Sequence, residues 1–498
     1  FRPAETLLLD ANDGVDSTPA ATVTVPGTPG GTEWCDVEVL RRLRRSSLAA
    51  LRSEVEPVDP ATYGRFLPVW QNVGTGLRGL DGVATVIDQL SGVPIPASAW
   101  EPLILGSRVR DYAPAMLDEL TATGEVLWSG HGSLPGNDGW IALHLAENAP
   151  LTLNPSPDFE PGALHQRLLE ILGNGGAYFF RQLSDTLAAV GPAETDANIV
   201  SALWELTWAG QISNDTFTPV RSLLSGGKTA HKQRAATPRA RTARMGRLGR
   251  APGASLTGSS MRLAAGGTAA AALRNAPPLV AGRWSLLPPV EADATLHAHA
   301  TAELMLDRYG VVTRGSVASE GTVGGFALLY RVLARLEEMG RCRRGYFIEQ
   351  LGAAQFAVPA TVDRLRSFSE DAQLKEPEPA AVALAATDPA NPYGAALPWP
   401  SLDGGHRPGR KAGALVVLVD GNLALYAERG GKTLLTFTED PELLQLSAAA
   451  LVQIIRRGAA EKMAIEKVNG ADILDTEAAR ALTAAGFYTT PKGLRYRV

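Results

Sequence analysis

The chain has 498 residues, enough for three or four domains that each bury a core, and 45% of its residues are apolar. Its two cysteines, Cys35 and Cys342, exclude a disulfide framework and a CxxC metal site and suit a reducing, cytoplasmic setting. No run of about 18 uncharged apolar residues is present, so we expect no contact with a membrane. The seven histidines are scattered, and the pair His297 and His299 lacks further ligands, so we expect no metal.

The net charge of −5 hides an uneven distribution. Between residues 216 and 290 there are twelve Lys or Arg and no Asp or Glu, which leaves the other 423 residues at −17. A block of this kind favours contact with a polyanion. Residues 226–281 are also rich in Gly, Ala, Ser and Pro, which predicts a basic flexible linker with four candidate nucleic-acid-binding side chains: Arg241, Arg244, Arg247 and Arg250.

In chain order, residues 1–33 read as an N-terminal segment and linker. Residues 34–160 read as a helical domain: a helix within "DVEVLRRLRRSSLAALRSEV", several shorter helices, and "DYAPAMLDELTATG" as a helix that Asp111 begins and Gly124 ends. Two strands around the turn "LPGND" follow it.

The order of helices and strands then recurs. Residues 161–225 and 282–370 each predict three helices followed by strands. Residues 371–440 predict a β-rich module, with "VVLVDGNLALYA" as a hairpin. Residues 441–498 predict a helical segment that completes this module and ends in a less regular copy of the pattern.

One short pattern marks every copy. "LDELTATGEV", "LWELTWAGQI", "LARLEEMGRC" and "ALTAAGFY" each place leucines on a helix, then a glycine, then a β-prone segment. Three helices and a hairpin are the elements of a winged helix, whose third helix can enter a major groove. We therefore expect an α+β protein with tandem winged-helix domains, a β-rich barrel-like module and a basic flexible linker. The third copy carries the candidate nucleic-acid-binding arginines: Arg314, Arg331, Arg335, Arg341, Arg343 and Arg344.

Two "GGKT" strings do not form a phosphate-binding loop. The motif requires a glycine five residues before the glycine that precedes lysine, and Ser222 and Tyr426 occupy those positions. We expect no cofactor in this chain.

Longer strings resemble a known family. "RDYAPAMLDELTATGEVLW", "RYGVVTRGSVASEG", "GGFALLYRVLARLEEMGRCRRGYFIEQLGAAQFAVP" and "ATDPANPYGAALPWP" are similar to the C-terminal half of the large helicase-related (Lhr) proteins. The resemblance implies a fragment of an ATP-dependent DNA repair helicase whose ATP and Mg sites lie in an N-terminal motor. It also implies DNA or an RNA–DNA hybrid as partner, contact with that helicase core, a homo-oligomer, and a cytoplasmic, nucleoid-associated location.

A fainter resemblance bears on chemistry. "QLSGVPIPASAWEPLILGSRVRDYAPAMLDEL" is similar in layout to the AlkZ-type winged-helix DNA glycosylases, which carry a Gln-apolar-Gln or Gln-apolar-Asp motif. In this chain Gln89 takes the first motif position and Ser91 the second. Because a serine hydroxyl is a poor base near neutral pH, Asp88 and Asp388 are the alternative catalytic carboxylates.

Structural roles compete with each of these assignments. Asp88 could be a solvated helix residue, Gln89 a polar helix end and Asp388 a turn former. Trp100, Trp128 and Trp140 favour the core over base stacking. Two functions therefore stay open: a nucleic-acid-binding and oligomerising module without chemistry of its own, or a glycosylase that excises uracil or an alkylated purine. A module serving oligomerisation alone is a third.

Overall fold

The computed structural model describes residues 21–23, 33–35, 56–156, 158–226, 277–369, 379–402, 406–460 and 462–498. Strands β1 (Ala21–Val23) and β2 (Glu33–Cys35) pair with each other near the N-terminus. The helix expected at residues 36–55 and most of the expected linker lie outside the described residues, and so do Arg241, Arg244, Arg247 and Arg250.

The first repeat is a winged helix formed by α2 (Pro60–Trp70), α3 (Gly79–Gln89), α6 (Pro114–Thr123) and the antiparallel hairpin β4 (Val126–Leu134)–β5 (Asp138–Leu145). Gly124 ends α6 in a left-handed conformation, as expected. The predicted N-cap is wrong, because α6 begins at Pro114 and Asp111 instead accepts a hydrogen bond from Gly79 N at the start of α3.

The segment between α3 and α6 closes this domain. It contains β3 (Ile95–Pro96), α4 (Ala97–Ala99), a π-helical turn (Trp100–Leu105) and α5 (Gly106–Arg108). Strand β3 adds to the hairpin, which gives the strand order β3-β5-β4. Helix α7 (Ala149–Thr152) follows β5.

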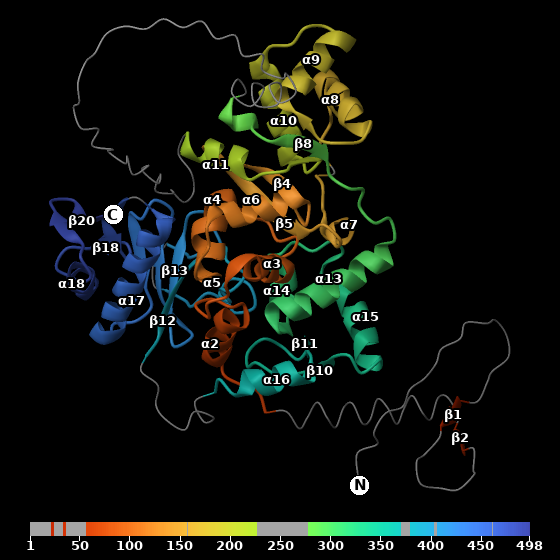
Figure 1. Ribbon diagram of the computed structural model, residues 1–498. Coiled ribbons are helices and arrows are strands. Elements are labelled where there is room, and N and C mark those ends of the chain that lie inside the picture. Colours follow the sequence, from red (N-terminus) through yellow and green to blue (C-terminus); the bar gives the residue numbers. More distant parts are fainter. Residues whose placement is uncertain are drawn as a thin grey trace, which may run out of the picture.

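The second winged helix contains residues from both sides of the expected linker at residues 226–281. It contains α8 (Ala163–Gly173), β6 (Tyr178–Phe179), α9 (Phe180–Val190), α10 (Asp196–Trp208), β7 (Ile212–Asn214) and α11 (Thr218–Ser225). Its middle strand is β8 (Arg283–Leu286), which pairs with both β6 and β7. Residues 283–286 therefore belong to this sheet and not to the repeat expected from residue 282 onward. Figure 1 shows this domain, including β8, at the top.

The third winged helix contains α13 (Ala294–Tyr309), β9 (Val311–Val312), α14 (Arg314–Ser319), α15 (Gly325–Glu338), β10 (Arg343–Gly345) and β11 (Gln355–Ala357). The strand order is β10-β11-β9, and α16 (Pro359–Arg366) follows. Thr313 caps α14 through a hydrogen bond from Ser316 N to its hydroxyl (3.1 Å). Leucines at positions 329, 333 and 336 bury one face of α15.

The β-rich module is an open sheet among the described residues, not the expected barrel. Its strands are β12 (Ala381–Ala385), β13 (Leu415–Val419), β14 (Asn422–Ala427), β15 (Thr433–Thr436), β17 (Lys467–Val468) and β18 (Ala471–Asp472), in that order. β12 and β18 are its two edges. The C-terminal segment supplies the last two strands, as expected.

The C-terminal segment also forms a smaller unit: α17 (Pro441–Ile454), a π-helical turn (Ile455–Ala459), β16 (Lys462–Ile465), α18 (Glu477–Ala484), β19 (Tyr488–Thr490) and β20 (Gly493–Arg497). Strands β16, β20 and β19 make its sheet.

Both faces of the six-stranded sheet are covered. Leu415 and Val417 of β13 pack into the cluster that holds the first winged helix and α17. Val416 and Leu418 pack into the cluster that holds α2 and the third winged helix. Because successive side chains of a strand point to opposite faces, one strand joins the two winged helices through the sheet.

The turn of the β13–β14 hairpin fixes the position of α2. Asp420 and Gly421 have φ of 48° and 80°, as a two-residue turn requires. Gly64 of α2 lies against this turn, and a Cβ on Gly64 would sit 2.1 Å from Gly421 O. A glycine at position 64 therefore lets the helix and the hairpin approach this closely.

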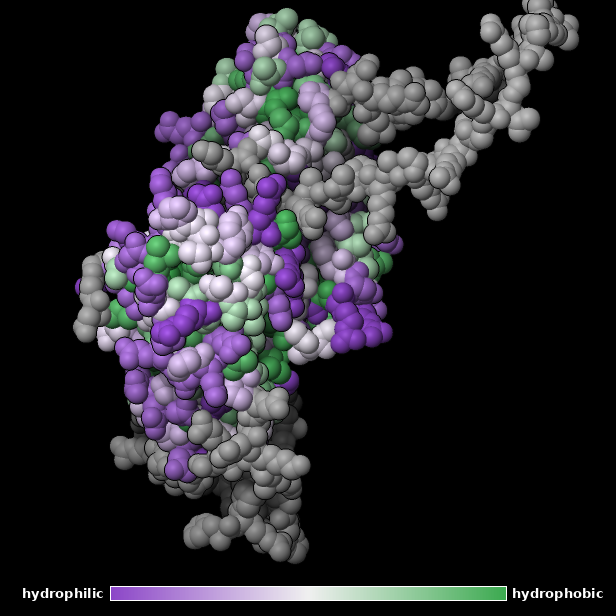
Figure 2. Space-filling model, turned by 90° about the vertical axis from the view of Figure 1, so that its left-hand side faces the viewer, coloured by the Kyte–Doolittle hydropathy of each residue, from purple (hydrophilic) through white to green (hydrophobic). Residues whose placement is uncertain are grey.

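On the face shown in Figure 2, hydrophilic residues cover much of the surface and hydrophobic residues occur in separate patches. None of the helices that the structure describes is long and apolar enough to cross a bilayer. No group of three or more metal-ligating side chains occurs in the described parts of the chain.

Candidate functional site

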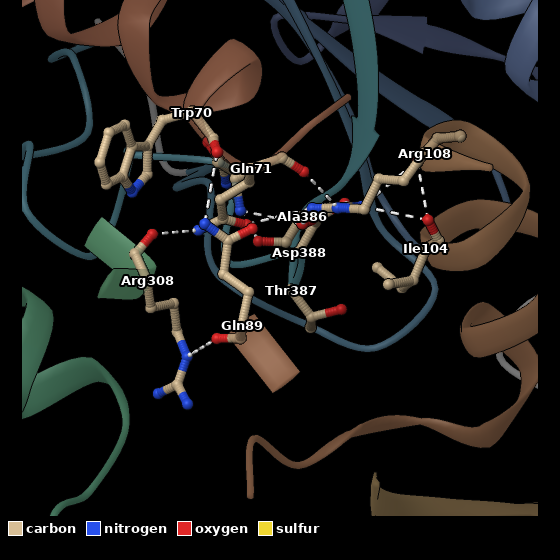
Figure 3. A network of polar contacts seen from close by, with 12 residues as sticks. Trp70, Gln71, Gln89, Ile104, Arg108, Arg308, Ala386, Thr387 and Asp388 are labelled. Carbon is tan, nitrogen blue, oxygen red and sulfur yellow. Dashed lines mark hydrogen bonds and ion pairs between the residues drawn. The ribbon is translucent and has the colours of Figure 1, made fainter. Parts of the chain in front are cut away.

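Gln89 ties two helices together. Its buried side-chain amide donates to Trp70 O at the end of α2 (3.3 Å) and to Asp307 O near the end of α13 (3.2 Å), as Figure 3 shows. Both contacts are to main-chain carbonyls of the first and third winged helices. The geometry gives this amide a structural role at the junction of the two domains.

Arg308 links the segment that starts at Gln89 to a carboxylate. Its guanidinium donates to Gln89 O (3.0 Å) and Ser91 O (2.7 Å), and its Nη1 lies 2.6 Å from Glu320 Oε2. Tyr309 OH donates to the other oxygen of Glu320 (2.7 Å). Ser91 Oγ is buried and has no hydrogen-bond partner among the described residues. The Gln-Leu-Ser segment thus positions Glu320 through its main chain.

Asp388 forms a buried ion pair. Its oxygens accept hydrogen bonds from Arg108 Nη2 (2.7 Å) and Nη1 (3.2 Å), and Oδ1 also accepts one from Ala390 N (2.9 Å). The side chains of Arg108 and Asp388 are only 1% and 0% exposed. A carboxylate fixed in this way anchors the loop that carries Thr387 and Asp388 against α5 and α2 (Figure 3).

Asp88 is exposed on α3. Partial burial raises the pKa of its carboxyl, and the neighbouring Glu147 raises it further. Asp88 in turn raises the pKa of Asp307, which desolvation has already raised. Asp88 does not line the cavity described next.

A cavity of about 330 Å³ opens where the first winged helix, the third winged helix and the β-rich module meet; we call it the junction cavity. The junction cavity is lined by Val93, Pro94, His131, Trp140, Tyr309, Ser319, Glu320, Thr387, Pro389 and Arg410. Its volume suits a flipped nucleobase with part of its sugar. Glu320 is the only carboxylate among these described lining residues.

A bulge in the hairpin brings two rings to the junction cavity. Gly130 pairs with Ile141 and Ser133 with Gly139, so His131 and Gly132 stand opposite the single residue Trp140. Gly132 has φ of 94°, which favours glycine. Because a bulge bends the strand and redirects its side chains, it explains how His131 and Trp140 reach the same cavity.

Thr387 and Arg410 are the polar residues that the β-rich module contributes to the lining of the junction cavity. Thr387 Oγ1 is buried and has no hydrogen-bond partner among the described residues. The Arg410 guanidinium binds four main-chain carbonyls of the 387–393 loop, including Asp388 O at 2.9 Å and Asn391 O at 2.7 Å. No carboxylate that the structure describes forms an ion pair with Arg410. The wall of the junction cavity therefore contains a carboxylate and a cation, and the buried Thr387 hydroxyl beside them has no described partner.

A second cavity, of about 570 Å³, also has His131 and Gly132 in its wall. Its other lining residues include Asn154, Phe159 and Trp208. Trp208 packs against Trp204 with ring centroids 5.2 Å apart. His131 thus lines both cavities.

The six arginines predicted to bind nucleic acid in the third winged helix differ in their contacts. Arg335, Arg341 and Arg344 pair with Glu338, Glu303 and Glu337. The three others, which are Arg314, Arg331 and Arg343, are exposed and form no ion pair with a described residue.

Sequence patterns do not reveal several residues of the junction cavity. Tyr309 and Glu320, together with Arg308 that pairs with Glu320, lie inside the string "RYGVVTRGSVASEG", which carries the family resemblance but no recognisable catalytic motif. The expectation of a core position is correct for Trp100 and Trp128, which are fully buried, but Trp140 lines the cavity. His131 has no signal in the sequence, since its position depends on a bulge.

The repeats place the chain among the tandem winged-helix proteins. Residues 58–146 and 291–377 each match a family model described as "Large helicase-related protein, winged-helix domain". Both of these winged-helix domains are therefore of the large helicase-related (Lhr) type, as the resemblance predicted.

Two relatives match almost the whole chain. It is 52% identical over 481 residues to "Lhr helicase/ probable uracil glycosylase" of Mycolicibacterium smegmatis, which covers 94% of this chain. It is 40% identical over 481 residues to "Lhr helicase/uracil glycosylase" of Escherichia coli, which covers 93%. The chain spans about 30% of the length of each relative.

A solved structure, the Streptomyces sahachiroi DNA glycosylase AlkZ, covers 83% of this chain and is itself covered completely, with a TM-score of 0.43 and 12% identity. A likeness at this level does not establish a common function.

Proposed function

We propose that this chain binds DNA and excises uracil from it, as a C-terminal module of an ATP-dependent DNA repair helicase. The observation that carries the proposal is the junction cavity, which is large enough for a base and combines Glu320, Arg410 and the unpartnered Thr387 hydroxyl. Two relatives that match most of this chain are named as a probable uracil glycosylase and a uracil glycosylase, and these names support the choice of substrate. An alkylated purine is the alternative substrate.

The chemistry required is hydrolysis of one bond. The bond between C1′ and N1 of deoxyuridine breaks, the base departs with the electron pair, and water adds to C1′. Water thereby supplies a hydroxyl to the sugar and a proton to uracil. Glu320 lies where a carboxylate could stabilise positive charge on the sugar or orient that water, and Arg410 could stabilise negative charge on the departing base. The protein must first rotate the nucleotide out of the helix.

We expect the purified chain, without ATP, to release uracil from an oligonucleotide that contains one deoxyuridine. Alkali then cuts the abasic site, and the cut strand is measured on a gel. Matched oligonucleotides with thymine, cytosine or an alkylated purine at the same position serve as controls. If alkali-sensitive product appeared with none of these substrates, the proposed activity would be refuted.

DNA binding has separate support in the exposed arginines of the third winged helix. Charge reversal at Arg331 and Arg343 (R331E/R343E) should weaken duplex binding and reduce the slope of log affinity against log salt by roughly 0.9 for each phosphate that is no longer neutralised. Fluorescence anisotropy at several salt concentrations measures both. R335E is the matched control, because Arg335 already pairs with Glu338. If R335E weakened DNA binding as much as R331E/R343E, Arg331 and Arg343 would not be part of the DNA interface.

The remaining partners are also proposals. We infer that the chain contacts the helicase core of the same polypeptide, where ATP and Mg would bind, and that the chain self-associates. We also infer an RNA–DNA hybrid as an alternative ligand and a cytoplasmic, nucleoid-associated location. Light scattering of the purified chain beside a DNA titration tests self-association. A monomer at all concentrations would contradict it.

A further inference from the structure

A chain of four hydrogen-bonding side chains runs from the junction cavity into the first winged helix. His131 Nε2 lies 2.9 Å from Ser129 Oγ, which lies 2.8 Å from His144 Nε2. His144 Nδ1 lies 2.7 Å from Thr152 Oγ1, whose hydroxyl donates to Asn148 O (3.2 Å). His144 and Ser129 are 0% and 1% exposed.

The protons in this chain can be placed by counting. The only proton of the Thr152 hydroxyl goes to a carbonyl, so Thr152 must accept from His144 Nδ1–H. Neutral His144 then accepts at Nε2, which takes the Ser129 proton. Ser129 Oγ is left to accept from His131 Nε2–H. The buried end of the chain therefore sets the tautomer of His131, leaving Nδ1 as an acceptor.

Both histidines are neutral at physiological pH. Burial lowers the pKa of His131 to about 4 and the pKa of His144 to about 3, with a further decrease from His131. No described residue forms a hydrogen bond with His131 Nδ1. The bulge at His131 and Gly132 places this ring in the wall of the junction cavity, opposite Trp140 in the strand pairing.

We propose that His131 is a specificity-determining residue, whose Nδ1 accepts a hydrogen bond from the N3–H group of an extruded uracil in the junction cavity. The inference rests on the proposed excision of uracil and names the group that recognises the base. Thr387, whose hydroxyl has no described partner, is the complementary donor for a uracil carbonyl. The ring of Trp140 provides an apolar wall for the base.

This arrangement distinguishes uracil from cytosine. Uracil carries a proton at N3, whereas cytosine carries a lone pair there. A lone pair facing Nδ1 would leave two buried acceptors opposed without a proton between them. Sites built to hydrogen-bond a particular group reject analogues that lack it by large factors, because the polar groups of the protein are then left unpaired.

The test compares two variants on two substrates. H131L removes the acceptor, whereas H131N keeps an oxygen near the position of Nδ1. We expect H131L to excise uracil at least about 30-fold more slowly than the wild type and H131N to recover most of this rate, consistent with a buried hydrogen bond of a few kcal/mol. With 3-methyluracil, which lacks N3–H, the wild type should lose its advantage over H131L. If His131 had a purely structural role, H131L would slow the excision of both substrates equally, and this result would overturn the inference.

A second measurement does not depend on excision. In the full chain with ¹⁵N-labelled histidine, H131N identifies the His131 signals, and the shifts should report protonation at Nε2 and a bare Nδ1. Millimolar uracil should shift the Nδ1 signal, and 3-methyluracil should not. If the wild type released no uracil but this selective shift occurred, the proposed excision would fail and the recognition would stand. If neither compound shifted Nδ1, the recognition would fail, whatever the excision assay gave.

Discussion

Replacing Arg108 with alanine should lower the free energy of unfolding by about 3–5 kcal/mol, because it leaves the Asp388 carboxylate buried without its partner. Both side chains are almost fully buried, and Arg108 also donates to Gln71 O (2.9 Å) and Gln71 Oε1 (3.1 Å). The substitution therefore removes an ion pair and two hydrogen bonds that hold α2 to α5. Urea denaturation followed by circular dichroism measures the decrease in stability.

Two control variants make this result specific. R480A removes an exposed pair with Glu477 one turn away on α18, and it should change stability by less than about 1 kcal/mol. The double variant R108M/D388L replaces the pair with apolar side chains and should recover part of the stability. A decrease below about 1 kcal/mol in R108A would show that Asp388 does not depend on Arg108.

The same hydrogen bonds affect how Asp388 should be tested for catalysis. Loss of activity in Asp388→Ala would follow from unfolding of the loop as readily as from loss of a base. We therefore expect D388A and R108A to lose stability and activity together. Activity retained in D388A at a temperature where it is folded would show that Asp388 is not the catalytic carboxylate.

Replacing Glu320 with glutamine should slow uracil excision by about 10²–10³-fold while the protein stays folded. Glutamine has the shape of glutamate and keeps an acceptor for Arg308 or Tyr309, but it carries no negative charge to stabilise the sugar or accept a proton from water. Single-turnover excision on a deoxyuridine oligonucleotide measures the rate. Anisotropy confirms that DNA is still bound.

A carboxylate on the neighbouring helix provides the matched control. E303Q changes a partly exposed glutamate on α13 that pairs with Arg341 and His299 and lies outside the junction cavity. It should leave the rate unchanged. If E320Q excised uracil within about threefold of the wild-type rate, Glu320 would not be the catalytic carboxylate.

Much of the fold follows from local patterns. Leucines that recur on one side of α15, with Gly340 after the helix, predict a third helix followed by a wing, and the hairpin with Asp420 and Gly421 at its turn forms as predicted. These features depend on residues a few positions apart, which interact in the same way in any helix or turn. The sheet was harder to predict, because its completion depends on pairing between β15 and β17, which are about 30 residues apart in the chain.

The same distinction between local patterns and tertiary packing applies to the candidate site. By itself, the sequence determined the winged-helix repeats and the basic block, and it directed attention to the segment from Gln89 to Ser91. Only the tertiary structure decided that this segment contributes main-chain carbonyls, that Asp388 is committed to Arg108, and that Glu320 and Thr387 share a cavity with His131. Those three side chains come from the end of α14, the β-rich module and a bulge in the first wing. Their proximity arises from packing between domains, which periodicity within one segment does not encode.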